Sequence, residues 1–191
     1  MSICIIPARG GSQRIPRKNI KMFHGKPIIQ YSMAVAEASG LFSDIVVSTD
    51  DQKIAALAHD LGVRVHPRPS ELALDEVGTQ EVARAVLIHE KAIGYREYDY
   101  ACVLYATAPM VTVEDLKEGF MLKVAHPGFP YLHSVDEWGR DCGAFYWGNV
   151  DDFIFNTPLE ENSLKLTIKG ACDINTREDW KRAEEMYGHF T

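Results

Sequence analysis

Short β-branched stretches alternate with patterns of helical period over the first two thirds of the 191-residue chain. This alternation predicts a single α/β domain, residues 1–191, in which helices on both faces cover a mostly parallel sheet. The length is that of one substantial core. The expected strands are 3–7, 44–51, 63–68 and 99–109, and the expected helices are 27–39, 50–59, 79–93 and 113–125.

Capping signals support several of these helix starts. Boxes of Thr followed three residues later by Gln or Asp occur at Thr49–Gln52, Thr112–Asp115 and Thr176–Asp179, and the last predicts a C-terminal helix. Pro27 fits the first turn of its helix, with Gly40 at the end. Residues 127–162 differ, because they are rich in aromatics, Gly, Asp and Asn without a helical period. Short strands and turns are expected there.

The charge distribution points to a small anionic ligand. The formal net charge is −7, which argues against general binding to nucleic acid. Nevertheless, the first 26 residues hold six Arg and Lys and no acid. No stretch approaches the length needed to span a bilayer, and the N-terminal stretch lacks the pattern of a signal peptide. A cytoplasmic protein without membrane partners is therefore expected.

The stretch "IIPARGGSQRIPRKN", residues 5–19, places glycines and cations directly after the first strand. In open α/β sheets, ligands collect at the carboxyl ends of the strands. Gly10 and Gly11 let backbone N–H groups approach phosphate oxygens, and Ser12 adds a hydroxyl. Arg9 and Lys18 can neutralise charge that grows during nucleotidyl transfer. The spacing is neither that of a Walker A motif nor GxGxxG, yet it predicts a phosphate-binding loop.

The longer string "PARGGSQRIPRKNI", with "GKPII" behind it, resembles the N-terminal signature of cytidylyltransferases that make CMP-activated nine-carbon sugar acids. These include CMP-sialic acid synthetases and pseudaminic acid cytidylyltransferases. Sialic-type enzymes typically show "QPTSPL" where residues 105–110 read "YATAPM", so the pseudaminic branch is favoured. Further similar stretches occur in order: "GLFSDIVVSTDDQKIA", "RPSELALDEVGT", "GAFYWG" and "CDINTREDW".

The resemblance implies a Rossmann-like nucleotide-diphospho-sugar transferase fold and two substrates, CTP and a small sugar acid. The anomeric hydroxyl would attack the α-phosphorus of CTP, and pyrophosphate would leave. Lys18 and Arg9 would be catalytic, with Asn19 supporting the loop. The implied nucleotide-binding residues are Ala8, Arg9, Gly10, Gly11, Ser12, Gln13, Lys18, Asn19, Arg68, Thr79, Tyr105, Ala106 and Thr107.

Local sequence leaves plainer alternatives for some of these residues. Arg68 lies between two prolines and also fits a surface arginine. Thr79 also fits a helix N-cap, and Tyr105 also fits the edge of the core. Asp50 fits an acidic charge in the first turn of a helix.

The resemblance also implies a Mg²⁺ cofactor. Asp173 and Asn175 stand in "CDINT", where the family generally reads "DID". Two such side chains spaced by one residue at a strand end point the same way and offer oxygens that Mg²⁺ prefers. Asp173 is the expected metal ligand and Asn175 a secondary one. An Asx turn is the alternative role of Asn175.

Two departures from the family pattern affect function. Gln13 stands where the family commonly has lysine. Between Val135 and Cys142, family members usually carry a few tens of residues that include a sugar-binding stretch and a dimer arm, so the region 127–162 is abbreviated. A homodimer is compatible with the sequence but lacks that arm. Three interpretations stay open: a minimal cytidylyltransferase, a nucleotidyltransferase with another acceptor, and a nucleotide-binding protein without transfer activity.

Overall fold

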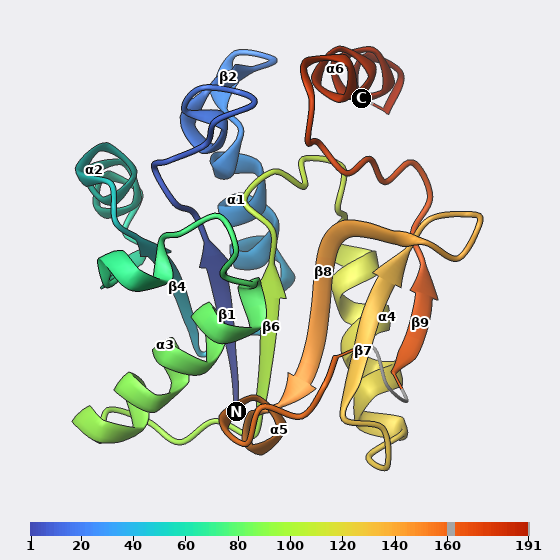
Figure 1. The fold of residues 1–191 in the computed structure, drawn as a ribbon. Coiled ribbons are helices and arrows are strands. Elements are labelled where there is room, and N and C mark those ends of the chain that lie inside the picture. Colours follow the sequence, from blue (N-terminus) through green and yellow to red (C-terminus); the bar gives the residue numbers. More distant parts are fainter. Residues whose placement is uncertain (160–162, 191) are drawn as a thin grey trace.

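A seven-stranded sheet forms the centre of the protein in a computed structural model that describes residues 1–159 and 163–190 (Figure 1). The strand order is β5-β4-β1-β6-β8-β7-β9. Every neighbouring pair is parallel except the two that involve β8, which runs against both β6 and β7. The strands are β1 Ser2–Pro7, β4 Asp44–Thr49, β5 Arg64–Pro67, β6 Tyr100–Leu104, β7 Tyr131–Val135, β8 Asp141–Asn149 and β9 Leu164–Thr167.

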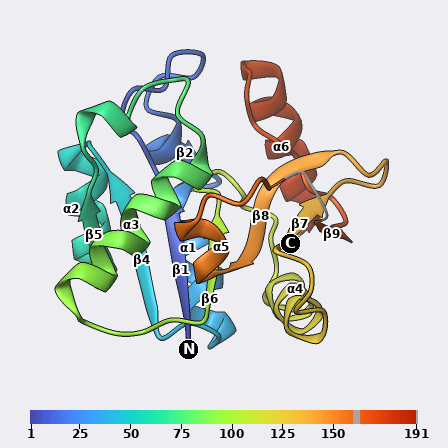
Figure 2. The same ribbon diagram turned by 60° about the horizontal axis from the view of Figure 1, so that its bottom comes forward.

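Helices cover both faces of the sheet (Figure 2). One apolar cluster joins the sheet to α1, α2 and α4, and a second joins the opposite face to α3 and α5. The last helix, α6, packs with the segment that follows β1 in a third cluster. The mostly parallel α/β fold expected from the sequence is therefore confirmed. The helices are α1 Ile29–Ser39, α2 Gln52–Asp60, α3 Thr79–Ile93, α4 Val113–Ala125, α5 Val150–Ile154 and α6 Arg177–Phe190.

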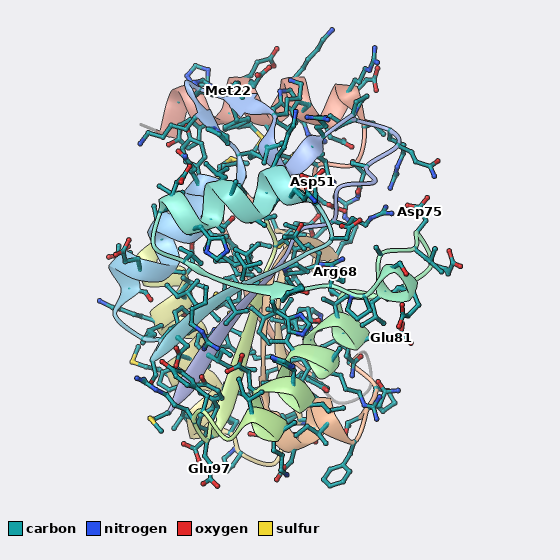
Figure 3. The ribbon with its side chains drawn as sticks, turned by 90° about the vertical axis from the view of Figure 1, so that its left-hand side faces the viewer. Met22, Asp51, Arg68, Asp75, Glu81 and Glu97 are labelled. Atoms are coloured by element: carbon teal, nitrogen blue, oxygen red, sulfur yellow. The ribbon has the colours of Figure 1, made fainter. Side chains whose placement is uncertain are left out.

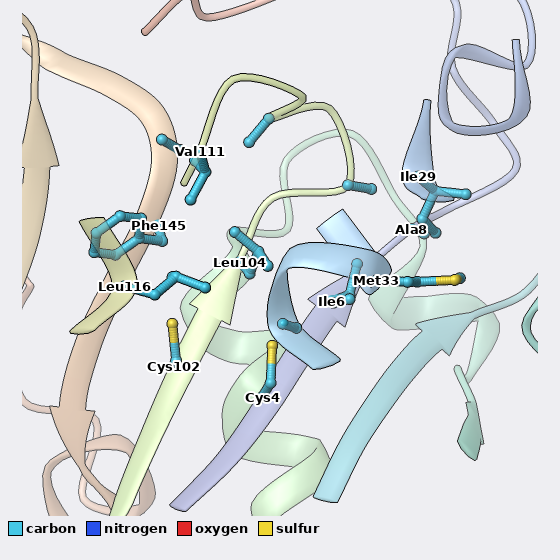
Figure 4. Close-up of a cluster of buried hydrophobic side chains, with 14 of the residues drawn as sticks. Cys4, Ile6, Ala8, Ile29, Met33, Cys102, Leu104, Val111, Leu116 and Phe145 are labelled. Carbon is cyan, nitrogen blue, oxygen red and sulfur yellow. The ribbon is translucent and has the colours of Figure 1, made fainter. Parts of the chain in front are cut away.

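The continuous apolar run of β1 is explained by burial on both faces. Cys4 and Ile6 point into the cluster under α1, whereas Ile3 and Ile5 point into the cluster under α3. Successive residues of a strand face opposite sides, so a central strand covered twice needs no polar alternation. Figure 4 shows Cys4 and Ile6 beside Met33 of α1 and residues of β6.

The start of the first helix was predicted wrongly. Pro27 lies in a two-stranded hairpin, β2 Met22–Phe23 and β3 Lys26–Pro27, rather than in a helical turn. The two residues of its turn, His24 and Gly25, have φ of 41° and 86°. Such values favour glycine. Gly40 does end α1, in the left-handed conformation at φ 65°.

The cap of α2 was also assigned to the wrong residue. Asp51 is the N-cap, and its carboxylate accepts hydrogen bonds from the backbone N–H groups of Lys53 and Ile54. The hydroxyl of Thr49 instead accepts from the N–H of Asp51. The capping boxes at Thr112–Asp115 and Thr176–Asp179 are confirmed, because each hydroxyl accepts from the N–H three residues on and each carboxylate accepts in return.

The abbreviated region, 127–162, contains β7 and β8 as expected, together with the short helix α5, which the sequence pattern missed. Residues 160–162 lie outside the described residues. The strands are joined by a tight turn that Asp136 organises by accepting from the N–H groups of Trp138 and Arg140. None of the helices in the described ranges is long and apolar enough to cross a membrane.

Candidate active site

A cavity of about 430 Å³ lies at the carboxyl edge of β1, β5 and β6, where the loops after these parallel strands meet. Ligand sites are expected at this edge of an open α/β sheet. Eleven residues that the sequence analysis selected line it: Arg9, Ser12, Gln13, Lys18, Asn19, Arg68, Thr79, Tyr105, Ala106, Thr107 and Asn175. The lining residues that were not selected are Pro7, Arg14, Asp75, Val77 and Val82.

Four selected residues do not line the cavity. Ala8 is fully buried, and its N–H donates to the carbonyl of Ser48. The N–H of Gly10 donates to the Asp50 carboxylate at 2.9 Å, so Asp50 supports the loop and is not a charge in the first turn of α2. Gly11 is in open surroundings. The fourth is Asp173.

Gly10 is required by the close approach of the loop to α2. A Cβ atom at this position would lie 2.7 Å from Oδ2 of Asp51, the residue that caps that helix. At Gly11, by contrast, a Cβ atom would meet nothing within 4 Å. The two glycines that look equivalent in the sequence therefore have different structural roles.

Asp75 holds two residues of the loop after β1, which was expected to bind phosphate. Its carboxylate forms an ion pair with the Arg9 guanidinium and accepts a hydrogen bond of 2.7 Å from the side-chain amide of Gln13. Asp75 comes from the segment before α3, and it lies on the same side of the molecule as Arg68 (Figure 3). The Asp75 carboxylate thus binds Arg9 and Gln13, two of the side chains of this loop that were expected to bind phosphate.

Lys18 connects this loop to the segment before α6. Its Nζ donates to the carbonyl oxygen of Ile174 at 2.5 Å. Burial lowers the pKa of Lys18, and the nearby Asp173 carboxylate opposes this effect. The amide of Asn19 donates to the Arg9 carbonyl at 2.9 Å, which is the loop-supporting contact that the resemblance implies.

Asp173 and Asn175 are adjacent but do not stand at a strand end. They lie in the irregular segment between β9 and α6, and the amide nitrogen of Asn175 donates to a carboxylate oxygen of Asp173. Burial raises the pKa of the Asp173 carboxyl, while Lys18 acts in the opposite direction. Within the described ranges, no three His, Cys, Asp or Glu side chains are grouped to hold a metal ion.

Arg68 is a buried cation rather than a surface residue. Its side chain is 8% exposed, and Nη2 donates to the carbonyl of Ser48 at 2.7 Å. Burial lowers the pKa of Arg68 to about 10, although Asp50 partly compensates. The guanidinium therefore remains charged at neutral pH.

Hydroxyl groups lie close together in the cavity wall around Thr79. Thr79 is the first residue of α3, with Gly78 in the N-cap position, so its alternative assignment as the N-cap is wrong. Its Oγ1 lies 3.0 Å from the hydroxyl of Tyr146 and 3.4 Å from that of Tyr105. Val77 and Val82 are neighbouring parts of the wall.

The cavity thus combines a basic part with a neutral part. Arg9, Arg14 and Lys18 supply positive charge from the loop after β1, whereas Thr79 and Tyr105 supply neutral hydroxyls. Such a set of groups suits a ligand that carries both a polyphosphate and a base. The volume lies within the range of small-molecule sites.

Comparisons with known proteins identify relatives of this chain. A family model described as "Cytidylyltransferase" matches residues 3–129. The chain is 33% identical to a pseudaminic acid cytidylyltransferase of Campylobacter jejuni subsp. jejuni, over 97% of this chain and 96% of that protein. N-acylneuraminate cytidylyltransferase A of Danio rerio is 36% identical over 69% of this chain and 29% of its own length.

Solved structures show the same fold. A CMP:2-keto-3-deoxy-manno-octonic acid synthetase solved with CTP has a TM-score of 0.75 at 16% identity, covering 100% of this chain and 99% of that one. A cytidylyltransferase from Leptospira borgpetersenii has a TM-score of 0.74 at 17% identity, covering 100% and 87%.

The chain is shorter than a second C. jejuni pseudaminic acid cytidylyltransferase, which is 31% identical and is covered over 96% of its length. That alignment runs over 229 positions, 38 more than this chain has residues, so the relative holds at least that many without counterparts here. The match nevertheless extends over 97% of this chain. The chain belongs to the cytidylyltransferase family.

Proposed function

We propose that this protein transfers the cytidylyl group of CTP to a nonulosonic sugar acid and releases pyrophosphate. The observation that carries the proposal is the cavity at the carboxyl edge of the sheet, which Arg9 and Lys18 line together with Thr79 and Tyr105. The relatives named above support CTP as the nucleotide and a sugar acid as the acceptor. Because CTP is the donor, we place the reaction in the cytoplasm.

The cations of the loop after β1 supply the positive charge that stabilises the transition state of the reaction. The anomeric oxygen of the acceptor forms a bond to the α-phosphorus, the bond from that phosphorus to the bridging oxygen breaks, and the hydroxyl proton passes to solvent. Negative charge grows on the phosphate oxygens and on the leaving pyrophosphate. Lys18, held at the carbonyl of Ile174, and Arg9 are the cations that stabilise this charge. Phosphate binding by Arg9 would compete with its ion pair to Asp75.

Magnesium dependence is part of the proposal. The Asp173 carboxylate beside Lys18 fits Mg²⁺ as a single protein ligand, since Mg²⁺ commonly combines one or two carboxylates with phosphate oxygens and water. Asn175 presents its amide nitrogen to Asp173, so it supports that carboxylate and is not a second ligand as placed. The ion would screen charge on the phosphates when bound.

The acceptor is best assigned to the pseudaminic type. The two C. jejuni relatives align over 97% of this chain and 96% of their own lengths, whereas an N-acylneuraminate cytidylyltransferase of Streptococcus agalactiae aligns over 93% of this chain and 51% of its own length. The tight turn at 136–140 leaves little of the usual sugar-binding insertion. The acceptor would therefore lie at the same edge of the sheet, next to the start of β8, and fewer residues would contact it.

Pyrophosphate release tests the proposal directly. Purified protein would be assayed with Mg²⁺, each of the four nucleoside triphosphates and a panel containing pseudaminic acid, N-acetylneuraminic acid and 2-keto-3-deoxy-manno-octonic acid. Release with CTP and pseudaminic acid above all other pairs is expected. Release with no pair, while calorimetry shows that CTP binds, would leave a nucleotide-binding protein and overturn the transferase assignment.

A further inference from the structure

A second cavity lies between the segment that follows β1 and the helix α6. Its volume is about 750 Å³, which is within the range of small-molecule sites. Figure 3 shows Met22, one of its lining residues, beside α6. The first wall consists of Ile15, Pro16, Arg17, Ile20, Lys21 and Met22, and the second wall of Arg177, Trp180, Lys181 and Glu184. These residues do not line the cavity of the candidate active site, which is called the first cavity below.

We propose that the second cavity binds a small organic anion with an apolar body and at least two anionic groups, and that this anion strengthens the binding of CTP. The binding site itself is independent of the proposed function. The effect on CTP rests on the proposed function, because it assumes that CTP binds in the first cavity.

The basic residues of the N-terminal segment are divided between the two cavities. Arg9, Arg14 and Lys18 line the first, whereas Arg17 and Lys21 line the second. Arg17 has a φ of 55°, a left-handed conformation that is costly for a residue with a Cβ atom. This conformation is retained where two consecutive cations, Arg17 and Lys18, line different cavities. The cations of the second cavity are thus not accounted for by the first.

The cations of the second cavity lack acidic partners. Within residues 1–159 and 163–190, none of its lysines and arginines forms an ion pair, and Glu184 is the single carboxylate among the described residues that line it. Like charges that share a site oppose one another unless an anion neutralises them. Since the whole chain has a net charge of −7, the positive charge is local to this cavity. Its ligand is therefore an anion.

The surface between the cations is apolar. Ile15, Ile20 and Met22 contribute it from the first wall, and Trp180 from the second. The ammonium group of Lys21 lies 3.9 Å from the centroid of the Trp180 ring, so positive charge is held directly against this surface. An inorganic anion would leave the apolar groups in water, whereas an organic anion would cover them.

The cations stand on both walls of the second cavity. Arg17 and Lys21 belong to the first wall, and Arg177 and Lys181 belong to the beginning of α6 in the second. A ligand with two anionic groups can make charge-assisted hydrogen bonds to both walls at once. A ligand with a single anionic group can bind one wall only.

The same two walls position Lys18 in the first cavity. Lys18 directly follows Arg17, and its Nζ donates to the carbonyl of Ile174, in the segment that leads into α6. An anion that binds both walls favours the arrangement in which this hydrogen bond forms. Because the coupling between two binding sites is reciprocal, CTP and the anion should each strengthen the binding of the other.

Calorimetry with a naphthalenedisulfonate tests the site, because this probe is a rigid aromatic dianion without phosphate. Saturable binding is expected, and a saturating concentration of CTP should tighten it about fivefold. Inorganic sulfate carries a similar charge without the apolar body. It should bind at least about tenfold more weakly than the probe.

The double variant Arg177→Gln, Lys181→Gln removes the charge of the second wall and leaves the first cavity intact. Its affinity for the probe should fall about tenfold or more, the size of one charge-assisted hydrogen bond. CTP alone should bind within about twofold of the unmodified protein. The matched control is Lys53→Gln, Lys117→Gln, which removes the same charge from exposed positions on α2 and α4 that line neither cavity. It should keep both affinities.

Met22→Glu is a second, independent variant. Met22 is 57% exposed, so the protein should tolerate the change, and the new carboxylate should repel the probe to a similar extent. Thermal melting checks that each variant folds. Unchanged affinity for the probe in the folded variants, equal affinity for sulfate, or displacement of CTP by the probe would overturn the site.

The two parts of the inference fail separately from the proposed function. Binding of the probe that CTP does not tighten would overturn the coupling. A protein that binds the probe in the second cavity but does not bind CTP would overturn the proposed function and leave the anion site in place.

Discussion

Asp75 and Arg9 form an ion pair in the wall of the cavity, although they come from different loops of the sheet edge. The same carboxylate accepts a hydrogen bond from the side-chain amide of Gln13, so Arg9 and Gln13 both bind the carboxylate of Asp75. A phosphate that takes the position of this carboxylate would have to displace it from Arg9. Under the proposed function, the ion pair would therefore compete with the nucleotide and lower the affinity of the loop for it.

Neutralising this competitor should strengthen binding. In Asp75→Asn, Arg9 is no longer paired with a carboxylate, and CTP and inorganic triphosphate are expected to bind about fivefold more tightly, as suits a partly exposed ion pair. Cytidine, which has no phosphate, should bind unchanged. Calorimetry with the three ligands measures these effects.

Glu76→Gln is the control for net charge, because Glu76 is exposed in the same segment and contacts neither Arg9 nor Gln13. It should leave all three affinities unchanged. Weaker binding of CTP to Asp75→Asn would instead mean that Asp75 holds Arg9 in its binding position.

Lys18→Ala should separate catalysis from folding. Lys18 is the cation between the loop and the carbonyl of Ile174, and its loss removes charge stabilisation from the phosphates. A decrease in kcat of about 100-fold or more is expected in the pyrophosphate assay. Lys26→Ala, on the exposed strand β3, should keep full activity. Unchanged turnover in Lys18→Ala would show that the loop was assigned wrongly.

The sequence predicted features that depend on neighbouring residues. The strand before Gly10, the capping box at Thr112 and the carboxyl-edge position of Lys18 all follow from local spacing or from the alternation of strands and helices. The alternation is sufficient to place the cavity, because parallel strands bring the loops after them to one edge.

Features that depend on distant partners could not be predicted in this way. Asp75 and Asp50 reach the loop after β1 only after folding, and no local pattern pairs them with Arg9 or Gly10. The hairpin at 22–27 has strands of two residues, which are too short to show a period. At the start of α2 both Thr49 and Asp51 are residue types that can cap a helix. Which of them does so depends on the path of the backbone, and the sequence does not show that path.

The two glycines of the loop should respond differently to substitution. In Gly10→Ala the new methyl group would collide with the Asp51 carboxylate and displace the cap of α2, which is expected to lower the free energy of unfolding by about 1–2 kcal/mol. Gly11→Ala meets open space and should cost less than about 0.5 kcal/mol. Urea denaturation of both variants measures the difference. Equal losses would show that backbone freedom, rather than the contact with Asp51, requires glycine at position 10.

His66 should make the protein sensitive to mild acid. It is 8% exposed, and its pKa is lowered from 6.5 to about 4 by burial, with the nearby His89 and Arg68 acting in the same direction. The hydroxyl of Ser48 lies 3.3 Å from Nδ1 of the ring and accepts from Nε of Arg68 at 3.4 Å.

The sign of the effect follows from the lowered pKa. Protonation of His66 is more favourable in the unfolded chain, so its contribution to stability is complete above pH 6.5 and is lost as the pH falls toward 4. The loss is on the order of 3 kcal/mol over this window. His66→Asn should be less stable at pH 7.5 but show a shallower decline of unfolding free energy between pH 6.5 and 4.5. His126→Asn, at an exposed position, should keep the steep decline, and an equally steep decline in His66→Asn would assign the acid sensitivity to other groups.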